Sequence, residues 1–598
     1  MRKNKLLAYT AMASAIGLAA AACGSSSGSS SASGGGGSSG FGAALTGVVN
    51  QNSATGGNVV YDDASTLDSA DPGNTYQAAN WDFLRLYDRT MLSYTPKAGA
   101  AGLTPEGDLA TGLGQHNADN TVWTYTIQPN AKFSDGTTIT TADVKYAIER
   151  SNWGHSVLTN GPTYFSSLVQ DNTKYAGPYN DRNTADGVSG IQTPNATTIV
   201  FTLNQPFADF DYLMTLPSTA PVERSTDKGA SYQQNMVTSG QYKISSYAIG
   251  KQMTLVPNTD FVTASDPNGL HKVLPSKITV NYGVNQDTID QNLLHGDAAM
   301  DIGGVGVDSA AQGQVLANPT YKGDSDSVPN GFQSYLSINT QLPLFQNLDC
   351  RQAVEWAVNK QAVVTAAGGT IGGGTVATTI LPPNNTGYVQ ANMYSTAGNE
   401  GDVTKAEALV ASCKAALGSK YNPSFAIATY DASDSPKSPK LADVVQANLN
   451  AIGFNVAVNQ YPFASFNSSA APGSPSTAVA AHIGMSLTTW GADFPTGYGY
   501  MQDILTPAGI SDSGGTYNTS YWSNDTFDND LNKALAASTP AESKAAYAAA
   551  DQYAMSQAVI VPLINTTALM YRPPTTTNVV VDSAYGMYDY TLLGTTNK

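Results

Sequence analysis

Two hydrophobic repeats alternate along the chain, which leaves few fold classes open to it. Apolar side chains occupy every second position in residues 122–127 but recur every three or four positions in residues 141–150. A repeat of two indicates a half-buried strand, and a repeat near 3.6 indicates an amphipathic helix. Residues 441–458 show both, because a helical repeat ends before Gly453 and a strand repeat follows it. The chain is therefore expected to be an α/β protein.

The helix expected at residues 141–150 begins with a recognisable cap. Thr140 precedes it, and Asp143 follows three positions later. This is a variant of the capping box, in which the two residues satisfy backbone amides of one another. The pattern predicts how the helix begins and implies no chemistry.

The first 22 residues have the order of a secretory signal. A basic start with Arg2, Lys3 and Lys5 precedes an alanine-rich apolar run, and Cys23 follows a block of small residues. The run lacks the roughly 20 strongly apolar residues of a membrane-spanning helix. Residues 1–22 are therefore expected to be a cleaved signal peptide, which places the mature protein outside the cytoplasm.

The end of this signal, AAAACGSSS, resembles the bacterial lipoprotein signal, although Ala20 stands where leucine is usual. The resemblance implies that the thiol of Cys23 receives a lipid; a lone cysteine beside an ordinary secretion signal is the alternative. Residues 24–40 are almost entirely glycine and serine, so they cannot bury enough surface to fold. We expect residues 23–44 to form a lipidated tether.

The length and charge of the remaining chain limit its number of subdomains and its kind of partner. About 555 of the 598 residues follow the tether, which is too many for one core and favours two or three subdomains. The net charge is −17, from 29 basic and 46 acidic residues. Such an acidic balance argues against nucleic acid as a partner.

Only two cysteines follow Cys23, at positions 350 and 413. In an oxidising compartment a sole pair is a candidate disulfide. Cys350 and Cys413 also lie on the apolar faces of two expected helices, so a pair of buried free thiols remains the alternative.

Several segments, in order along the chain, resemble the family 5 solute-binding proteins of ABC importers. They include EGDLATGL at 106–113, VWTYTIQPNAKFSDGTTITTADVKYAIER at 122–150, YLSINTQLPLFQNLDCRQAVEWAVNKQAVV at 335–364 and TWGADF at 489–494. Each motif alone is weak evidence for this family, but the occurrence of all of them in the family's order is specific to it. The resemblance spans nearly all of residues 58–590.

The resemblance implies a two-lobed periplasmic-binding-protein-like fold of type II, cluster C, with an inserted small third domain. Two strands are expected to cross between the lobes, near residues 330 and 560, which permits hinge closure around a ligand. The expected parts are lobe I at residues 45–90, 195–325 and 560–598, the small domain at 91–194, and lobe III at 326–559.

The resemblance also implies ligand-binding residues. Peptide-binding members use a W-x-A-D segment to hold the peptide ammonium, and Trp490, Gly491, Ala492 and Asp493 match it. Asp493 would then form a charge-assisted hydrogen bond with the ammonium, while Trp490, with Gly491 and Tyr498, would line the ligand pocket. Capping of loop amides by Asp493 and core packing of the two aromatic rings are the alternatives.

The match fails directly after this segment, because PTGYGY at 495–500 replaces the family's acidic and proline residues. The identity of the ligand is expected to depend on this loop. Asp63 and Ala64 resemble the lobe I turn that flanks bound peptide, with an ordinary surface loop as the alternative. Arg351 is expected to be a structural ion-pair partner, and no cation for the peptide carboxylate is assigned.

Signatures of catalysis are lacking. The five histidines form no HExxH motif, and GGTIGGGT at 368–375 lacks the Lys-Ser/Thr of a phosphate-binding loop. A Ser-His-Asp site can be assembled from distant residues, so a secreted hydrolase is the rival class. We predict that the chain is not an enzyme and uses no cofactor or metal.

The sequence thus predicts an extracytoplasmic solute-binding protein, anchored to the cell membrane through its lipid. It would capture oligopeptides by closure of its lobes and pass them to an ABC permease, acting as a monomer and without nucleic acid. An oligosaccharide or a nickel chelate is the alternative ligand within the family. The 32 tyrosines and 6 tryptophans favour the sugar, since sugar faces stack on aromatic rings.

Overall fold

The computed structural model describes residues 40–597, except 182–186, 434, 467 and 469–470. The expected signal peptide, Cys23 and nearly all of the glycine and serine tether lie outside the described residues. Among the described residues, no helix combines the length and the apolar character needed to cross a bilayer.

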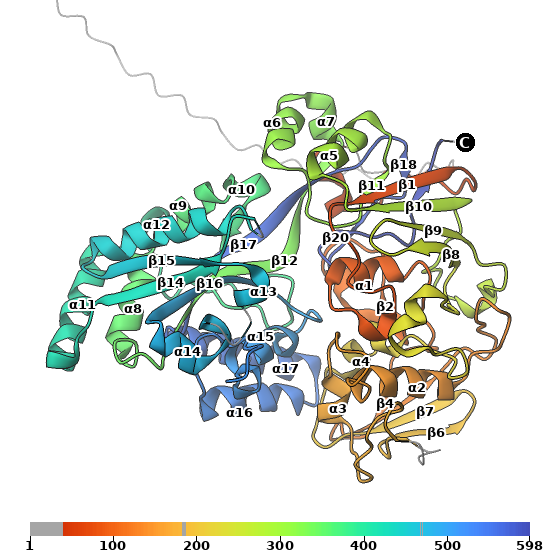
Figure 1. Cartoon of the computed structure of the whole chain (residues 1–598), viewed down its shortest axis with the longest axis horizontal. Coiled ribbons are helices and arrows are strands. Elements are labelled where there is room, and N and C mark those ends of the chain that lie inside the picture. Colours follow the sequence, from red (N-terminus) through yellow and green to blue (C-terminus); the bar gives the residue numbers. More distant parts are fainter. Residues whose placement is uncertain (1–39, 182–186, 434, 467, 469–470, 598) are drawn as a thin grey trace, which may run out of the picture. The chain divides into compact units, whose positions relative to one another are not determined.

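A five-stranded mixed sheet organises the first part of the chain (Figure 1). Its central strand β10 pairs in parallel with β1 and antiparallel with β9. Ile278, Val280 and Tyr282 are buried on one face of β10, as a strand with one covered face requires. In spatial order the strands are β11 (Met300–Asp301), β1 (Asn58–Asp63), β10 (Lys277–Tyr282), β9 (Gln252–Pro257) and β8 (Tyr242–Ala248).

An antiparallel four-stranded sheet lies between β1 and β8 in the sequence, and helix α2 (Thr141–Asn152) packs against its strands β6 and β7. The predicted cap of this helix is confirmed: a carboxylate oxygen of Asp143 accepts from the amide (2.8 Å) and the hydroxyl (2.7 Å) of Thr140. The strands are β4 (Gln115–His116), β5 (Val122–Thr126), β7 (Thr198–Thr202) and β6 (Ile191–Asn195).

A six-stranded mixed sheet organises the second part of the chain. Helix α12 (Ser438–Ala451) ends before Gly453, whose φ of +93° turns the chain into β15, as the sequence predicts. In spatial order the strands are β13 (Gly374–Val376), β17 (Ile560–Tyr571), β12 (Ser325–Ile338), β16 (Ile483–Gly491), β14 (Ser424–Tyr430) and β15 (Asn455–Tyr461).

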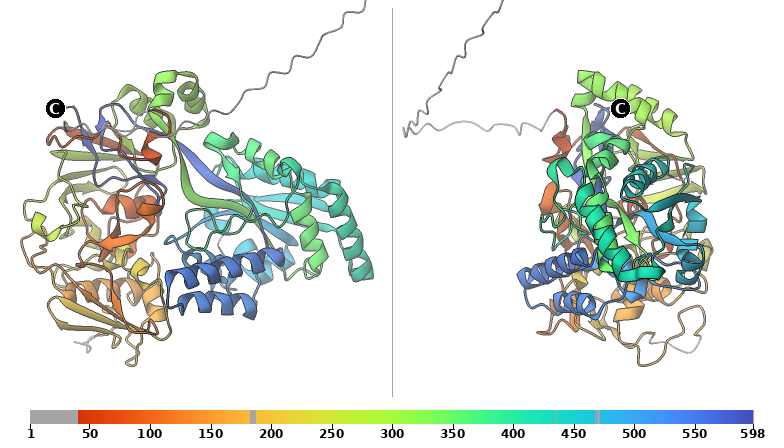
Figure 2. Two further views of the ribbon diagram at one scale, coloured as in Figure 1. Left: turned by 180° about the vertical axis from the view of Figure 1, so that it is seen from behind. Right: turned by 90° about the vertical axis from the view of Figure 1, so that its left-hand side faces the viewer.

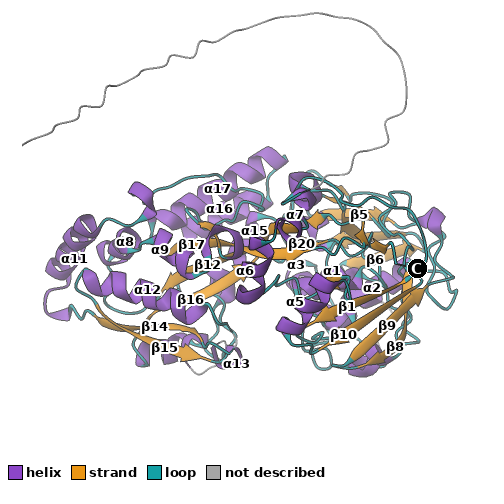
Figure 3. Cartoon of the chain, turned by 90° about the horizontal axis from the view of Figure 1, so that it is seen from above, coloured by secondary structure: helices purple, strands orange, loops and turns teal. Residues whose placement is uncertain are grey.

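Helices cover this second sheet. Helix α12 contacts β14 and β15, α8 contacts α11, and α16 lies beside α17 (Figure 3). The structure joins Cys350 and Cys413 as a disulfide between α8 and α11, with their Cα atoms 5.4 Å apart. The remaining bounds are α8 (Leu348–Ala357), α9 (Lys360–Ala366), α11 (Val403–Leu417), α15 (Gly497–Leu505), α16 (Asp525–Leu535) and α17 (Pro540–Ser556).

Two long strands, β12 and β17, belong to both cores. They run antiparallel and side by side (Figure 2), with an irregular register between Pro329 and Gln333. Val328 and Met570, near one end of the pair, pack into the core of the first sheet. Leu336 and Val561, near the other end, pack into the core of the second. The pair therefore links the two cores through paired backbone.

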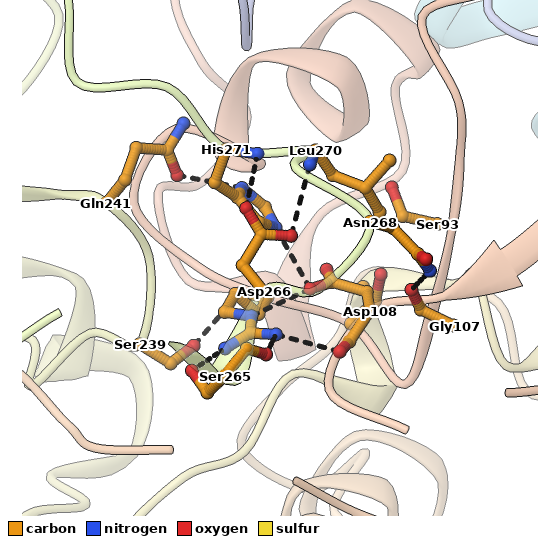
Figure 4. Close-up of polar contacts among 12 residues, drawn as sticks. Ser93, Gly107, Asp108, Ser239, Gln241, Ser265, Asp266, Asn268, Leu270 and His271 are labelled. Carbon is orange, nitrogen blue, oxygen red and sulfur yellow. Dashed lines mark hydrogen bonds and ion pairs between the residues drawn. The ribbon is translucent and has the colours of Figure 1, made fainter. Parts of the chain in front are cut away.

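A buried ion network stabilises the first part of the chain. Arg89 donates to the Asp108 carboxylate at 2.7 Å, and the His271 ring lies 2.9 Å from the same oxygen (Figure 4). Burial alone would raise the pKa of Asp108, but His271 and Arg89 outweigh it and lower this pKa to about 2. Asp108 is the second of two acids in the EGDLATGL segment, and its contacts serve the fold.

Candidate ligand-binding site

Asp493 lies in a short turn between strand β16 and helix α15. Its backbone amide donates to the Gly499 carbonyl at 3.3 Å. Thr496 caps the helix, because its hydroxyl oxygen accepts from the Gly499 amide at 3.2 Å. These contacts fold the turn back onto the first turn of α15 and fix the backbone of Asp493.

The Asp493 carboxylate is bonded to two tyrosines from distant parts of the sequence. Its Oδ2 atom accepts from the Tyr76 hydroxyl at 2.8 Å and from the Tyr164 hydroxyl at 2.6 Å. Tyr76 precedes helix α1 (Ala78–Leu84), and Tyr164 opens helix α3 (Tyr164–Leu168). No donor among the described residues reaches Oδ1, so one oxygen of this carboxylate is available to a ligand.

The charge of Asp493 is held in an unfavourable environment. The side chain is half-buried, and burial raises its pKa to about 6, although the hydrogen bonds from Tyr164 and Tyr76 act in the opposite direction. Asp503 of α15 is also half-buried. Burial, and then the neighbouring charge of Asp493, raise the pKa of Asp503 to about 7. The two acids therefore form a weakly compensated negative site.

Three other predicted residues lie on the elements that flank the Asp493 turn: Trp490 and Gly491 on β16, and Tyr498 on α15. The Trp490 indole donates to the Tyr500 carbonyl at 3.1 Å, and its ring lies 5.1 Å from the Tyr517 ring. A side chain at Gly491 would clash, because its Cβ would lie 2.6 Å from the Phe332 ring. The Tyr498 ring packs edge-on against Phe207 at 5.1 Å. Trp490 and Tyr517, which is 37% exposed, form an aromatic surface at this site.

Asp63 and Ala64 are not brought to Asp493 by any contact among the described residues. The Asp63 carboxylate accepts from the Ser65 amide (2.8 Å) and hydroxyl (2.9 Å), which closes a local turn after β1. Burial raises the pKa of Asp63. Ala64 is exposed, so it is accessible without being part of the Asp493 cluster.

The expectation that Arg351 is an ion-pair partner is wrong. Its guanidinium donates to the carbonyls of Gln557 (2.8 Å), Phe345 (2.7 Å) and Gln346 (3.2 Å). No carboxylate among the described residues lies in ion-pair distance of it. Arg351 instead ties the segment before α8 to Gln557, the residue that follows α17. The Gln557 carbonyl lies at a helix C-terminus, where carbonyls lack intrahelical donors.

One group of buried acids resembles a metal site in composition. Asp82, Asp582 and Asp589 bring carboxylate oxygens within 4.8 Å of one another. The Arg85 guanidinium donates to all three, at 3.1 Å to Asp582 and 2.8 Å to Asp589. The positive charge at this cluster is therefore supplied by an arginine of the chain itself.

Four residues of the site have no counterpart in the sequence prediction: Tyr76, Tyr164, Asp503 and Tyr517. The two tyrosine donors are separated from Asp493 by 417 and 329 positions, so no local pattern links them to it. Asp503 could have been found from the sequence, because it is a second acid ten positions after Asp493 in a stretch without basic residues.

The fold and sequence match known proteins. Residues 104–512 match the family described as Bacterial extracellular solute-binding proteins, family 5 Middle. The probable D,D-dipeptide-binding periplasmic protein DdpA of Escherichia coli K12 is 24% identical over 513 residues, which cover 84% of this chain and 87% of that protein.

Two solved structures confirm the expected α/β fold class. The clavulanic acid biosynthesis oligopeptide binding protein 2 is 30% identical, with a TM-score of 0.87 over 93% of this chain and 98% of its own. Listeria monocytogenes OppA bound to peptide is 19% identical and shares the fold, with a TM-score of 0.63 over 91% of this chain and 100% of its own. The chain belongs to the bacterial extracellular solute-binding proteins of family 5.

Proposed function

We propose that this chain captures peptides by their amino-terminal ammonium group and delivers them to an ABC permease. The observation that carries the proposal is the Asp493 carboxylate, which is fixed by two tyrosine hydroxyls on one oxygen and has no donor among the described residues on the other. Relatives named as dipeptide- or oligopeptide-binding proteins support this ligand class.

The chemistry of binding follows from the environment of this carboxylate. An ammonium has three donors and a positive charge, so it can bond Oδ1 while the tyrosines keep Oδ2. A charge-assisted bond in a partly desolvated site is stronger than one in water. The ligand is therefore held without any bond being made or broken.

Closure of the lobes would bring the partners of Asp493 together. Tyr76 and Tyr164 belong to the part of the chain that precedes β12, whereas Asp493 follows β16 of the second sheet. The irregular register of β12 between Pro329 and Gln333 offers a place for the strand pair to bend. The expected domain boundaries, at residues 325–326 and 559–560, coincide with the starts of these two linking strands.

The lipid on Cys23 would keep the mature protein beside the permease. Each buried CH2 of an acyl chain contributes roughly 0.8 kcal/mol, so two or three chains give stable anchoring. The glycine and serine tether that follows Cys23 would let the folded part reach the permease.

A sugar is the second candidate ligand. The Trp490 and Tyr517 rings lie 5.1 Å apart, and Tyr517 is 37% exposed. Aromatic surfaces of this kind stack on the apolar faces of sugars as well as on peptide side chains.

Thermal unfolding of delipidated protein separates these ligands. Panels of di- to pentapeptides, oligosaccharides and nickel chelates are compared, and a ligand at 100 times its Kd stabilises the folded state by roughly 2.7 kcal/mol. We expect a rise in Tm with free-amine peptides. A rise with a sugar or chelate, and none with any peptide, would overturn the proposal.

A further inference from the structure

We propose that Asp503 is a specificity-determining residue, which together with Asp493 selects peptides that carry a second positive charge at their first residue, such as an amino-terminal arginine. The inference rests on the proposed function, because it takes Asp493 as the site of the ligand ammonium. It adds the class of peptide that the site prefers.

Helix geometry places Asp503 next to the anchor. Asp493 donates its amide to the Gly499 carbonyl at 3.3 Å, and Asp503 follows Gly499 by four positions in α15. Residues four apart lie on the same face of a helix, one turn from each other. The side chain of Asp503 is therefore on the helix face against which the Asp493 turn folds.

The described residues supply no ion-pair partner to Asp493 or Asp503. No lysine or arginine occurs between Lys440 and Lys533. None of the ion pairs of the described residues includes Asp493 or Asp503. A single ammonium would balance one carboxylate and leave the other half-buried and uncompensated, which is costly.

The site also has acceptors that lack donors. Among the described residues, neither the Asp503 carboxylate nor the Oδ1 atom of Asp493 accepts a hydrogen bond. The hydroxyls of Tyr76 and Tyr164 are already used, since both donate to Asp493. A ligand that brings several donors would satisfy these acceptors.

A guanidinium fits these needs better than a neutral group. It carries five N–H donors in a planar fork that can bond a carboxylate through two of them. The face of a guanidinium also stacks on aromatic rings. The Tyr517 ring, which lies beside Trp490, is available near both acids. Burial raises the pKa of Tyr517, and the charges of Asp503 and Asp493 raise it further. Burial raises the pKa of Asp503 to about 7, so a bound cation would be expected to displace its proton.

Calorimetric titration with matched peptides tests the inference. Arg-Ala-Ala is compared with citrulline-Ala-Ala, which has nearly the same shape without the side-chain charge, at pH 7.5. We expect the arginine peptide to bind about tenfold more tightly. In Asp503→Asn this preference should fall to about twofold. A cooperative thermal unfolding transition near the wild-type Tm shows that the variant is folded.

The control is Asp512→Asn, which removes the same charge from an exposed position nine residues further on and should keep the full preference. Equal binding of the two peptides by the wild type, or an undiminished preference in Asp503→Asn, would overturn the inference and leave the proposed function standing. Failure of every peptide to bind would instead overturn the proposed function.

Discussion

Asp493 is a residue whose charge is costly in the empty site and useful in the occupied one. Burial raises its pKa to about 6 from an ordinary value near 4, so near this pH a fraction of the molecules carries a proton there. An ammonium binds the ionised form, because only that form offers a full negative charge. Protonation and ligand binding therefore compete at this carboxylate.

This competition predicts weaker peptide binding in acid. The free-state pKa of Asp493 is about 6, so lowering the pH from 7 to 5 should raise the Kd by about tenfold, while the peptide ammonium stays charged throughout. Calorimetric titration of Ala-Ala-Ala across this range measures the effect. An affinity at pH 5 equal to that at pH 7 would show that Asp493 does not hold the ammonium.

The sequence predicts the residues of this site that are neighbours along the chain, but not those that come from distant segments. The W-x-A-D pattern points to Asp493 and Trp490 because four neighbouring positions carry it. The tyrosine donors cannot be found in this way, since Tyr76 and Tyr164 reach Asp493 only once the chain has folded. The partners of Arg351 are hidden for a related reason: they are main-chain carbonyls before α8 and after α17, and a sequence does not show where carbonyls lie.

At the scale of elements, helix caps and turns could be predicted from a few neighbouring residues. The Thr140 cap is confirmed, and so is the turn from α12 through Gly453 into β15, because caps and glycine turns depend on few residues. The role of Asp108 depends on partners from distant segments. Arg89 and His271 hold this acid between the start of the chain and the loop that follows β9.

Removal of the Asp108 charge should destabilise the protein. Asp108→Asn leaves Arg89 without its buried partner, which costs about 3 to 5 kcal/mol in comparable sites. Because the folded pKa of Asp108 is lowered to about 2, the stability that its charge contributes is present above about pH 4 and is lost as the pH falls towards 2.

Urea unfolding of Asp108→Asn and of the exposed control Asp512→Asn measures this effect at pH 7. A variant as stable as the control would contradict the role assigned to the network. In the wild type, a stability that does not decrease between pH 4 and pH 2 would contradict the direction of the pKa shift.

The disulfide between α8 and α11 gives a second prediction at this scale. Cys350 and Cys413 enclose a separation of 63 positions, for which loop closure predicts up to about 4 kcal/mol of stabilisation. Titration of the denatured, unreduced protein should find no thiol at these positions, and reduction should lower the Tm. Two reactive thiols besides Cys23 would show that the cysteines are free.

At the scale of the whole molecule, membership of a solute-binding family confirms a binding protein rather than an enzyme. The order of weak motifs along the chain predicted this family, since chance does not place several of them in sequence. The motifs do not predict how the two cores meet. That contact is made by side chains such as Tyr164 and Asp493, 329 positions apart, and by the strand pair β12 and β17.

The most direct test of the account is a calorimetric comparison of two peptides on two proteins. Ala-Ala-Ala and its N-acetyl form, which lacks the ammonium, are titrated into the wild type and into Asp493→Asn. We expect the wild type to bind the free amine at least about 30-fold more tightly, as truncation of one partner of a buried charge pair costs roughly 2 kcal/mol or more. In Asp493→Asn the two peptides should bind alike. Undiminished binding of Ala-Ala-Ala by the variant would contradict the central claim that Asp493 holds the ligand.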